Sequence, residues 1–256
     1  MIWDQLSSKQ HAELDRNIPV LLNLAATEQH GAHLPVSTDR LIGQHFAHEL
    51  NKEIPERILI LPSMGVGCSD HHMEFAGSLS LSHATFAALV KDMVHSVFHH
   101  GFRTIILLNS HGGNQGIMQV IVEQLGFANP DKHVVGVTWW NLVKAELKKI
   151  TETQSGGTGH ACEFETSLIK EIAPHLVNDD LIKEGANVAT FSWAEGDMLM
   201  GPSASYYRTM KAMTPNGVFG NPVLSSAEKG KEISARVVKA LKQLVLDLHG
   251  IDPDSK

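Results

Sequence analysis

Residues 18–39 read IPVLLNLAATEQHGAHLPVSTD, and this stretch decides how the chain folds. Its first nine residues form an almost unbroken apolar run, which is typical of a strand buried on both faces of a parallel sheet. The run then turns polar, and Ser37 or Thr38 can cap a helix that we expect to continue to about Asn51. The stretch therefore predicts the first strand and the first crossover helix of an α/β sheet.

Further strands and helices alternate along the chain. Short apolar runs predict strands over residues 57–62, 104–109 and 133–139. Apolar residues at helical spacing predict helices over residues 1–17, 82–100, 115–125, 163–173 and 226–248. Residues 63–81 and 187–223 show no clear periodicity, and no linker divides the chain. The alternation predicts one domain over residues 1–256, a three-layer α/β/α sandwich with a mainly parallel central sheet.

Composition and charge exclude several classes of function and partner. The chain has 256 residues, a formal net charge of −7 and no long basic run, which argues against nucleic acid as a partner. No apolar run reaches membrane-spanning length, and the N-terminus lacks the pattern of a secretory signal. The two cysteines, Cys68 and Cys162, fit a reducing compartment. No pairing pattern with histidine and asparagine indicates that either thiol is a nucleophile. We therefore expect a cytoplasmic protein with a small-molecule substrate and no membrane partner.

The polar part of the opening stretch concentrates metal-binding side chains. Glu28 and His30 are two residues apart, so in an extended backbone they face the same side. Gly31 and Pro35 can turn the chain, so that Asp39 in the first turn of the next helix folds back toward them. Two carboxylates and an imidazole at one point suit zinc, manganese or iron(II).

Two later segments carry similar groups. His111 lies in NSHGGN, on the turn between a predicted strand and a helix, where glycines allow a tight bend and a close approach to a ligand. GHACEFETS opens a helix and contains His160, Glu163 and Glu165. The two glutamates are two residues apart and cannot share a helix face, so at most one of them is expected to contact a metal.

Four polar or aromatic segments follow successive strands of the predicted sheet, and ligands bind beyond the carboxyl ends of parallel strands. They are EQHGAHLP, CSDHH, NSHGGN and the Trp139–Trp140 pair. The coincidence favours one shared site. Ser69 and His72, in the long loop after the second strand, can add a ligand or contact substrate. Trp139 and Trp140 follow the fourth strand and can wall a pocket for a flat polar ring, although such residues often belong to a core.

Three motifs together resemble the creatininase (creatinine amidohydrolase) family. They read LAATEQHGAHLPVSTD, NSHGGN and GHACEFETS here, and their order and spacing over residues 24–167 also match. The resemblance implies an α/β/α sandwich, often assembled as a hexamer, with a site for two divalent ions of zinc, manganese or iron. The chain differs from creatininase proper where the latter has a tyrosine and a metal-binding glutamate just after the histidine that matches His111. This chain has Gly112 and Gly113 there.

The resemblance also implies a role for each matching residue. Glu28 and His111 would hold one ion, His30 the other, and Asp39 would bridge both. A further carboxylate should complete the second ion's site, and Glu165 is preferred to Glu163. His160 matches a histidine that acts near the substrate in proton transfer or binding, with Glu163 as a possible helper.

We therefore expect a hydrolase in which two metal ions activate water to cleave a carbon–nitrogen amide-type bond of a small, polar, cyclic substrate. One alternative is hydrolysis of a carbon–carbon bond in a diketone-type oxidised inositol. Another is a structural protein that binds metal but has no activity.

Overall fold

Strand β1 (Val20–Leu24) lies inside a parallel sheet because both of its faces are apolar. It pairs in parallel with β2 (Leu59–Ile60) on one side and with β3 (Thr104–Asn109) on the other. Strand β4 (His133–Thr138) pairs in parallel with β3. Parallel neighbours need crossover connections, and helices supply them here.

Successive residues of the central strands pack into two different hydrophobic cores. In the computed structural model, which describes residues 1–154 and 157–250, Val20 and Leu22 belong to one core and Leu21 to the other. Strand β3 alternates in the same way. This two-sided burial explains why both strands read as continuous apolar runs rather than as alternating patterns.

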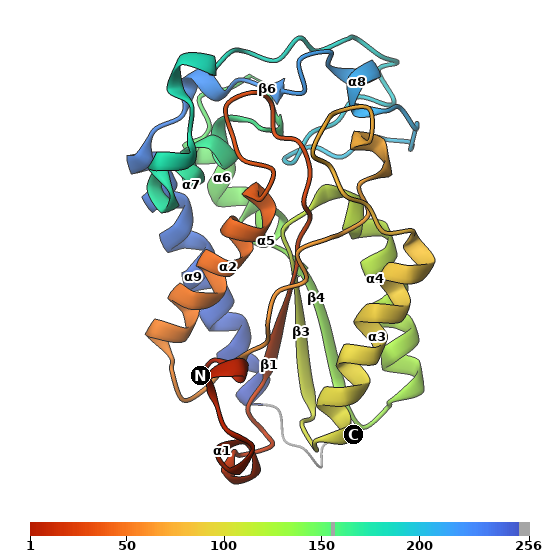
Figure 1. The fold of residues 1–256 in the computed structure, drawn as a ribbon, viewed down its shortest axis with the longest axis vertical. Coiled ribbons are helices and arrows are strands. Elements are labelled where there is room, and N and C mark those ends of the chain that lie inside the picture. Colours follow the sequence, from red (N-terminus) through yellow and green to blue (C-terminus); the bar gives the residue numbers. More distant parts are fainter. Residues whose placement is uncertain (155–156, 251–256) are drawn as a thin grey trace.

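Helices cover both faces of the sheet and complete the predicted three-layer sandwich (Figure 1). Helices α2 (Thr38–Glu53), α7 (Glu163–Ile172) and α9 (Ala227–His249) contact one another and share the core of one face. Helices α3 (His83–His99) and α4 (Gln115–Ala128) contact each other and share the core of the opposite face.

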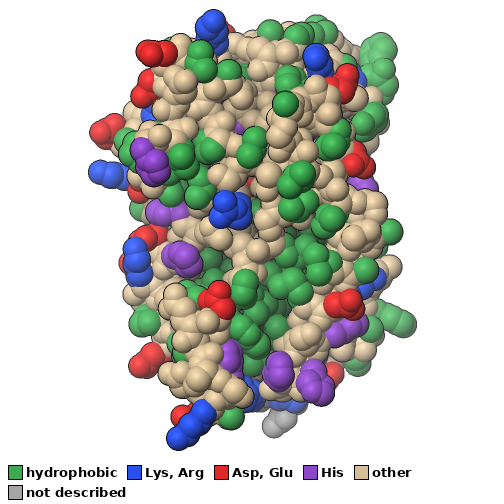
Figure 2. All heavy atoms as spheres, viewed as in Figure 1, with side chains coloured by type: hydrophobic (Ala, Val, Ile, Leu, Met, Phe, Trp, Pro, Cys, Tyr) green, Lys and Arg blue, Asp and Glu red, His purple; other side chains and the backbone are tan. Residues whose placement is uncertain are grey.

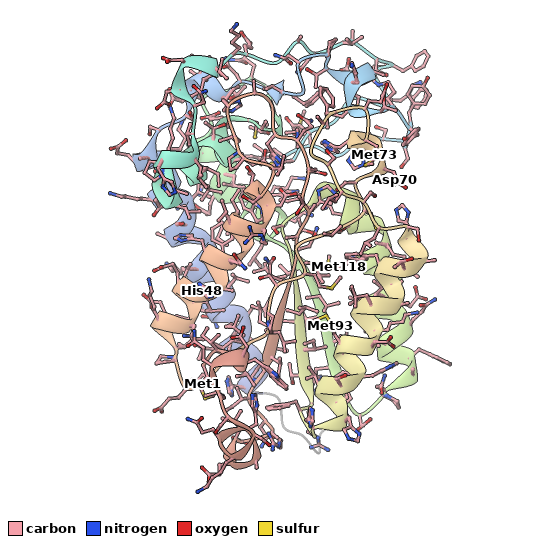
Figure 3. The ribbon with its side chains drawn as sticks, in the orientation of Figure 1. Met1, His48, Asp70, Met73, Met93 and Met118 are labelled. Carbon is pink, nitrogen blue, oxygen red and sulfur yellow. The ribbon has the colours of Figure 1, made fainter. Side chains whose placement is uncertain are left out.

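Methionines help to fill the core under α3 and α4. Met118 is buried, and the half-buried Met93 packs against the same cluster between the helices and the sheet (Figure 3). An unbranched thioether adapts to irregular gaps. This core gives β1 and β3 a firm support, so that the loops leaving their ends start from fixed positions.

Shorter elements lie mostly near the carboxyl ends of the strands. The short helices and strands are α1 (Ser8–Glu13), α5 (Trp139–Leu142), α6 (Lys144–Ile150), β5 (Thr158–His160), α8 (Met210–Met213) and β6 (Phe219–Gly220). Single 3-10 turns occur at Trp3–Gln5, Asp70–His72, Gly112–Asn114, Pro174–Leu176, Asp179–Leu181 and Pro222–Leu224. Strands β5 and β6 form an antiparallel pair.

Some predicted bounds differ from the observed ones. The first helix is shorter than predicted, because its cap is Ser7, whose side chain accepts from the N–H of Gln10. Helix α2 does begin at Thr38, but Ser37 makes no side-chain cap bond. The fourth strand ends one residue early, since Trp139 begins α5. The sequence did not predict α6 or β5, which are too short to show a period.

Residues 187–223 form a cap above the carboxyl ends of the strands, with α8 and β6 at the top of Figure 1. Acidic and basic side chains are interspersed on the face seen in Figure 2, where several histidines also lie in the open. Histidine number alone therefore does not mark a site. Among the described helices, none has the length and apolar character needed to cross a bilayer.

Candidate metal centre

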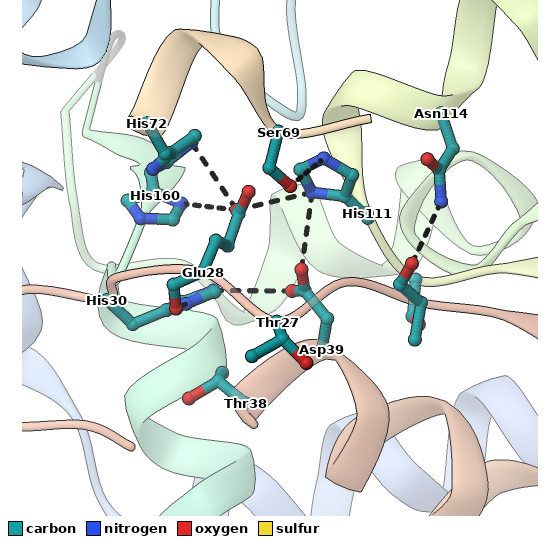
Figure 4. A network of polar contacts seen from close by, with 12 residues as sticks. Thr27, Glu28, His30, Thr38, Asp39, Ser69, His72, His111, Asn114 and His160 are labelled. Carbon is teal, nitrogen blue, oxygen red and sulfur yellow. Dashed lines mark hydrogen bonds and ion pairs between the residues drawn. The ribbon is translucent and has the colours of Figure 1, made fainter. Parts of the chain in front are cut away.

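Acidic and imidazole side chains from separate segments meet beyond the ends of β1 and β3 (Figure 4). They come from the loop after β1, the first turn of α2, the loop before α3, the turn after β3, the end of β5 and the first turn of α7. All are buried. They are Glu28, His30, Asp39, His72, His111, His160 and Glu165. The structure therefore brings together the five residues expected to bind metal.

The Asp39 carboxylate lies between two histidines. Its Oδ1 is 3.2 Å from Nε2 of His30, and its Oδ2 is 3.2 Å from Nδ1 of His111. Each histidine also faces a second carboxylate. Oε1 of Glu28 is 3.2 Å from Nδ1 of His111, and Oε1 of Glu165 is 3.8 Å from Nε2 of His30. Two carboxylate–imidazole groups thus share one central carboxylate.

Backbone carbonyls fix which nitrogen of each ring faces the cluster. Nδ1 of His30 lies 3.1 Å from the carbonyl oxygen of Glu28, and Nε2 of His111 lies 3.0 Å from that of Cys68. A carbonyl oxygen only accepts, so these nitrogens carry the ring protons. In the neutral rings, the opposite nitrogens therefore direct their lone pairs toward the carboxylates. This outer hydrogen bond is the usual support of a metal-binding histidine.

The cluster leaves buried polar atoms without hydrogen-bond partners among the described residues. These atoms are Oε2 of Glu28, Nε2 of His30 and Oδ2 of Asp39. The imidazole lone pairs and the carboxylate oxygens repel each other unless a cation lies between them. Buried polar atoms without partners also lower the stability of the fold. The residues present therefore fit divalent metal ions, which prefer this mixture of imidazole and carboxylate ligands.

The electrostatics of the cluster indicate the same requirement for positive charge. Burial alone favours the neutral ring, but the facing carboxylates raise the pKa of His30 and of His111 well above the usual value. Burial opposes ionisation of Asp39, yet the two histidines hold the pKa of its carboxyl well below the usual range. The carboxylates therefore favour positive charge at both histidines.

Two asparagines shape the turn that carries His111. The Asn109 amide donates to the His111 carbonyl (2.8 Å), and its Oδ1 accepts from the His111 N–H (3.2 Å). Asn114 accepts from the N–H of Cys68 (3.0 Å) and donates to the carbonyl of Ala25 (3.2 Å). The turn after β3 is thereby tied to the loops that follow β1 and β2.

His160 also directs a lone pair into the cluster. Its Nε2 is 2.7 Å from the carbonyl oxygen of Gln29, so this nitrogen carries the ring proton. Its Nδ1 lies 3.7 Å from Oε1 of Glu28. Burial and the neighbouring His30 lower the pKa of His160 to about 3. The ring is therefore neutral near pH 7, and Nδ1 carries a lone pair.

His72 differs from His30, His111 and His160, because its protonated ring nitrogen is the one that faces Glu28. The N–H of Gly31 donates to Oε1 of Gln29 (2.9 Å), which places the Gln29 amide nitrogen 3.1 Å from Nδ1 of His72. Nδ1 therefore accepts, and the proton of the neutral ring lies on Nε2, 3.4 Å from Oε1 of Glu28. His72 thus supports Glu28 as a hydrogen-bond donor. Sequence reasoning missed Gln29, although it lies inside the motif EQHG.

Glu163 does not join the cluster. Its carboxylate pairs with Lys229 and accepts hydrogen bonds from Thr151 (2.9 Å) and from the N–H of Glu152 (3.0 Å). Burial opposes its ionisation, but the Lys229 contact lowers its pKa. The position of Glu163 does not support the role in proton transfer that the sequence suggested. Glu165, two residues further along the helix, does face the cluster. Only one of the two glutamates therefore lies there, as their spacing predicted.

The residues expected to bind substrate have different surroundings. Trp139 is buried in the core against Phe46, with ring centroids 5.6 Å apart, so it does not wall a pocket. Trp140 and His72 do line the cavity above the cluster. Ser69 is buried, and its Oγ lies 3.3 Å from Nε2 of His111 (Figure 4), so it supports the His111 ring and does not line the cavity.

A cavity of about 320 Å³ opens above the cluster. Its floor includes Glu28, Asp39 and His111, and the loop at residues 63–81 contributes His71 and His72. Most of its roof comes from residues 194–219. These roof residues show no hydrophobic period, and the aromatic content of residues 187–223 is the feature of the sequence that could have indicated them. The volume is that of a small-molecule site.

Gly113 has no room for a side chain. A Cβ at this position would lie 2.1 Å from the carbonyl oxygen of Cys68, whereas one at Gly112 would meet nothing within 4 Å. We expect Gly113→Ala to lower the free energy of unfolding by about 2–3 kcal/mol, since the backbone must move. Gly112→Ala should change it by less than about 0.5 kcal/mol. Urea unfolding of both variants measures this, and equal stabilities would contradict the close approach.

The family model for creatininase, described as creatinine amidohydrolase, matches residues 4–245. The mycofactocin precursor peptide peptidase of Mycobacterium ulcerans is 27% identical over 93% of this chain and 88% of its own length. The creatinine amidohydrolase of Pseudomonas putida is 28% identical over 88% of each chain. The 3-dehydro-scyllo-inosose hydrolase of Thermotoga maritima is 23% identical over 90% of this chain and 77% of its own.

Solved structures agree with the fold. A putative creatinine amidohydrolase from Bacteroides fragilis superposes with a TM-score of 0.78 at 27% identity, covering 92% of this chain and 91% of its own. Two creatininase structures, described as the Mn form and as a Zn-Zn type variant, have TM-scores of 0.78 and 0.77 at 23% identity. Each covers 98% of this chain and at least 98% of its own.

Proposed function

The chain belongs to the creatininase family of hydrolases, and we propose that it uses two divalent metal ions to hydrolyse a carbon–nitrogen amide-type bond. The observation that carries the proposal is the Asp39 carboxylate, whose two oxygens each face a different imidazole nitrogen at 3.2 Å. A carboxylate placed in this way is suited to bridge two ions.

The ligand sets follow from the same contacts. Glu28, Asp39 and His111 would hold one ion, and His30, Asp39 and Glu165 would hold the other. When bound, zinc, manganese or iron(II) ions would lower the pKa of a water molecule and polarise the substrate carbonyl.

His160 is the group in this site best placed to move a proton. Its neutral ring presents Nδ1 to the cavity floor, while the Gln29 carbonyl holds the opposite edge. We propose that Nδ1 accepts a proton from the attacking water and passes it to the leaving nitrogen. General acid–base catalysis of this kind contributes about 10²–10⁴-fold to the rate.

Metal analysis of purified protein tests the proposal. We expect about two divalent ions per chain in the wild type and a large loss in the isosteric variant Asp39→Asn, because a carboxamide cannot bridge two cations. Asp92→Asn, an exposed change on α3, is the matched control and should retain both ions. If the wild-type protein binds no metal even after reloading with zinc or manganese, the proposal is wrong.

The reaction products then identify the bond. Release of ammonia, an amine or formate from amide substrates supports carbon–nitrogen hydrolysis. A ring-opened acid without nitrogen would instead favour the carbon–carbon reaction, which the relation to an inosose hydrolase keeps as the second candidate. Two bound ions without turnover of either substrate type would indicate a binding protein.

A further inference from the structure

The cavity above the metal centre has a polar floor and an apolar upper wall. The floor consists of the acidic and imidazole groups already described. The upper wall consists mainly of apolar and aromatic side chains, none of which is charged. They are Trp140, Met198, Pro202, Met210, Met213 and Phe219.

Most side chains of the apolar wall are buried or half-buried beside the cavity. Met210 and Trp140 are 6% and 4% exposed, and Met198, Met213 and Phe219 are half-buried, each beside the cavity. Methionine side chains adapt their shape to an apolar ligand. Water molecules form few hydrogen bonds with such a wall. An apolar ligand group that displaces this water therefore binds favourably.

Phe219 places this wall beside the proposed proton-transfer residue. Phe219 on β6 is the register partner of His160 on β5. A Cβ at Gly159 would lie 1.9 Å from Cδ1 of Phe219, so the ring occupies the space where a side chain of residue 159 would be. The glycine thereby lets an aromatic ring pack against the backbone next to His160.

Polar groups in the upper part of the cavity are few. Asp197 also lines the cavity. Its Oδ1 accepts from the N–H groups of Leu199 and Met200 (2.8 and 2.7 Å) and so stabilises the turn over residues 197–200. The other polar side chains of the lining away from the cluster are Gln115 and Tyr206, which has a single hydroxyl on an aromatic ring. A substrate that is polar all round would leave most of its groups unpaired against this wall.

We propose that the substrate is amphipathic, with a hydrolysable polar end at the metal centre and an aromatic or branched aliphatic group against the wall beside His160. The inference rests on the proposed function and replaces the wholly polar ring that the sequence suggested. The cavity volume of about 320 Å³ is that of a small-molecule site, and an apolar group of the size of a phenyl ring suits it.

Metal-directed probes test the wall separately from turnover. Acetohydroxamic acid and 3-phenylpropanohydroxamic acid carry the same chelating group and differ in the apolar extension. By calorimetry on zinc-loaded protein, we expect the phenyl probe to bind about tenfold or more tightly than the acetyl probe. Met198→Gln and Met213→Gln, which keep the side-chain length, should each reduce this preference about threefold or more.

Met200→Gln is the matched control, because Met200 lies on the same segment, is 48% exposed and does not line this cavity. It should leave the preference unchanged. Unchanged acetohydroxamate affinity in every variant shows that the fold and the centre are intact. Equal binding of the two probes to the wild type, or a preference that survives both cavity substitutions, would overturn the inference. If neither probe binds zinc-loaded protein, the metal-centre proposal fails as well.

Discussion

Replacing Glu165 with glutamine is expected to remove one of two metal ions and to lower hydrolysis by about a thousandfold, equivalent to ~4 kcal/mol of transition-state stabilisation. Oε1 of Glu165 faces Nε2 of His30 at 3.8 Å, and Oε2 accepts from the N–H of Cys162 at 3.4 Å. Glutamine can keep the second contact through its carbonyl oxygen. Its NH₂ group would then face the His30 lone pair, and an amide nitrogen of this kind is no metal ligand.

Glu163→Gln is the control, because it makes the same substitution two residues earlier on the same helix. Glu163 is buried and pairs with Lys229, so this variant should keep both ions while losing stability. Metal content and amide hydrolysis, measured on both variants at equal folded concentration, separate the two glutamates. If Glu163→Gln lost metal and Glu165→Gln kept it, our assignment of the second ion's carboxylate would be reversed.

The sequence predicted the part of the site that depends on local order and strand position. Glu28 and His30 share a face because they are two residues apart, and Asp39 joins them because helix α2 begins one residue before it. His111 follows β3, which pairs directly with β1, so parallel pairing places it beside Glu28. These relations follow from strand periodicity and sheet order, which apolar runs reveal.

The sequence could not predict contacts that depend on packing between distant segments. Both tryptophans follow β4 and belong to the core, but only Trp140 also reaches the cavity among the described lining residues, a difference decided by the turn into α5. The partner of Glu163 lies 66 residues away on α9, and no local pattern indicates that pairing. The cavity roof comes from irregular segments whose course no hydrophobic period encodes.

The ion pair between Glu163 and Lys229 predicts a large effect on stability. The Glu163 side chain is fully buried and that of Lys229 is 8% exposed. Lys229 also contacts Glu152 at 2.8 Å and donates to the Leu224 carbonyl at 2.7 Å. The pair joins the first turn of α9 to the first turn of α7, which carries Glu165. Its loss would leave a buried carboxylate without its cation.

We expect Lys229→Met to lower the free energy of unfolding by about 3–5 kcal/mol. Removal of one partner of a buried ion pair leaves the other charge desolvated and without compensation. Adding Glu163→Gln to the same protein should recover part of this loss, since the buried charge is then absent. Urea unfolding of the two single variants and the double variant gives the coupling energy. Additive losses would show that the two side chains act independently. Lys242→Met, which breaks a surface pair with Glu53, should cost less than about 1 kcal/mol and serves as the control.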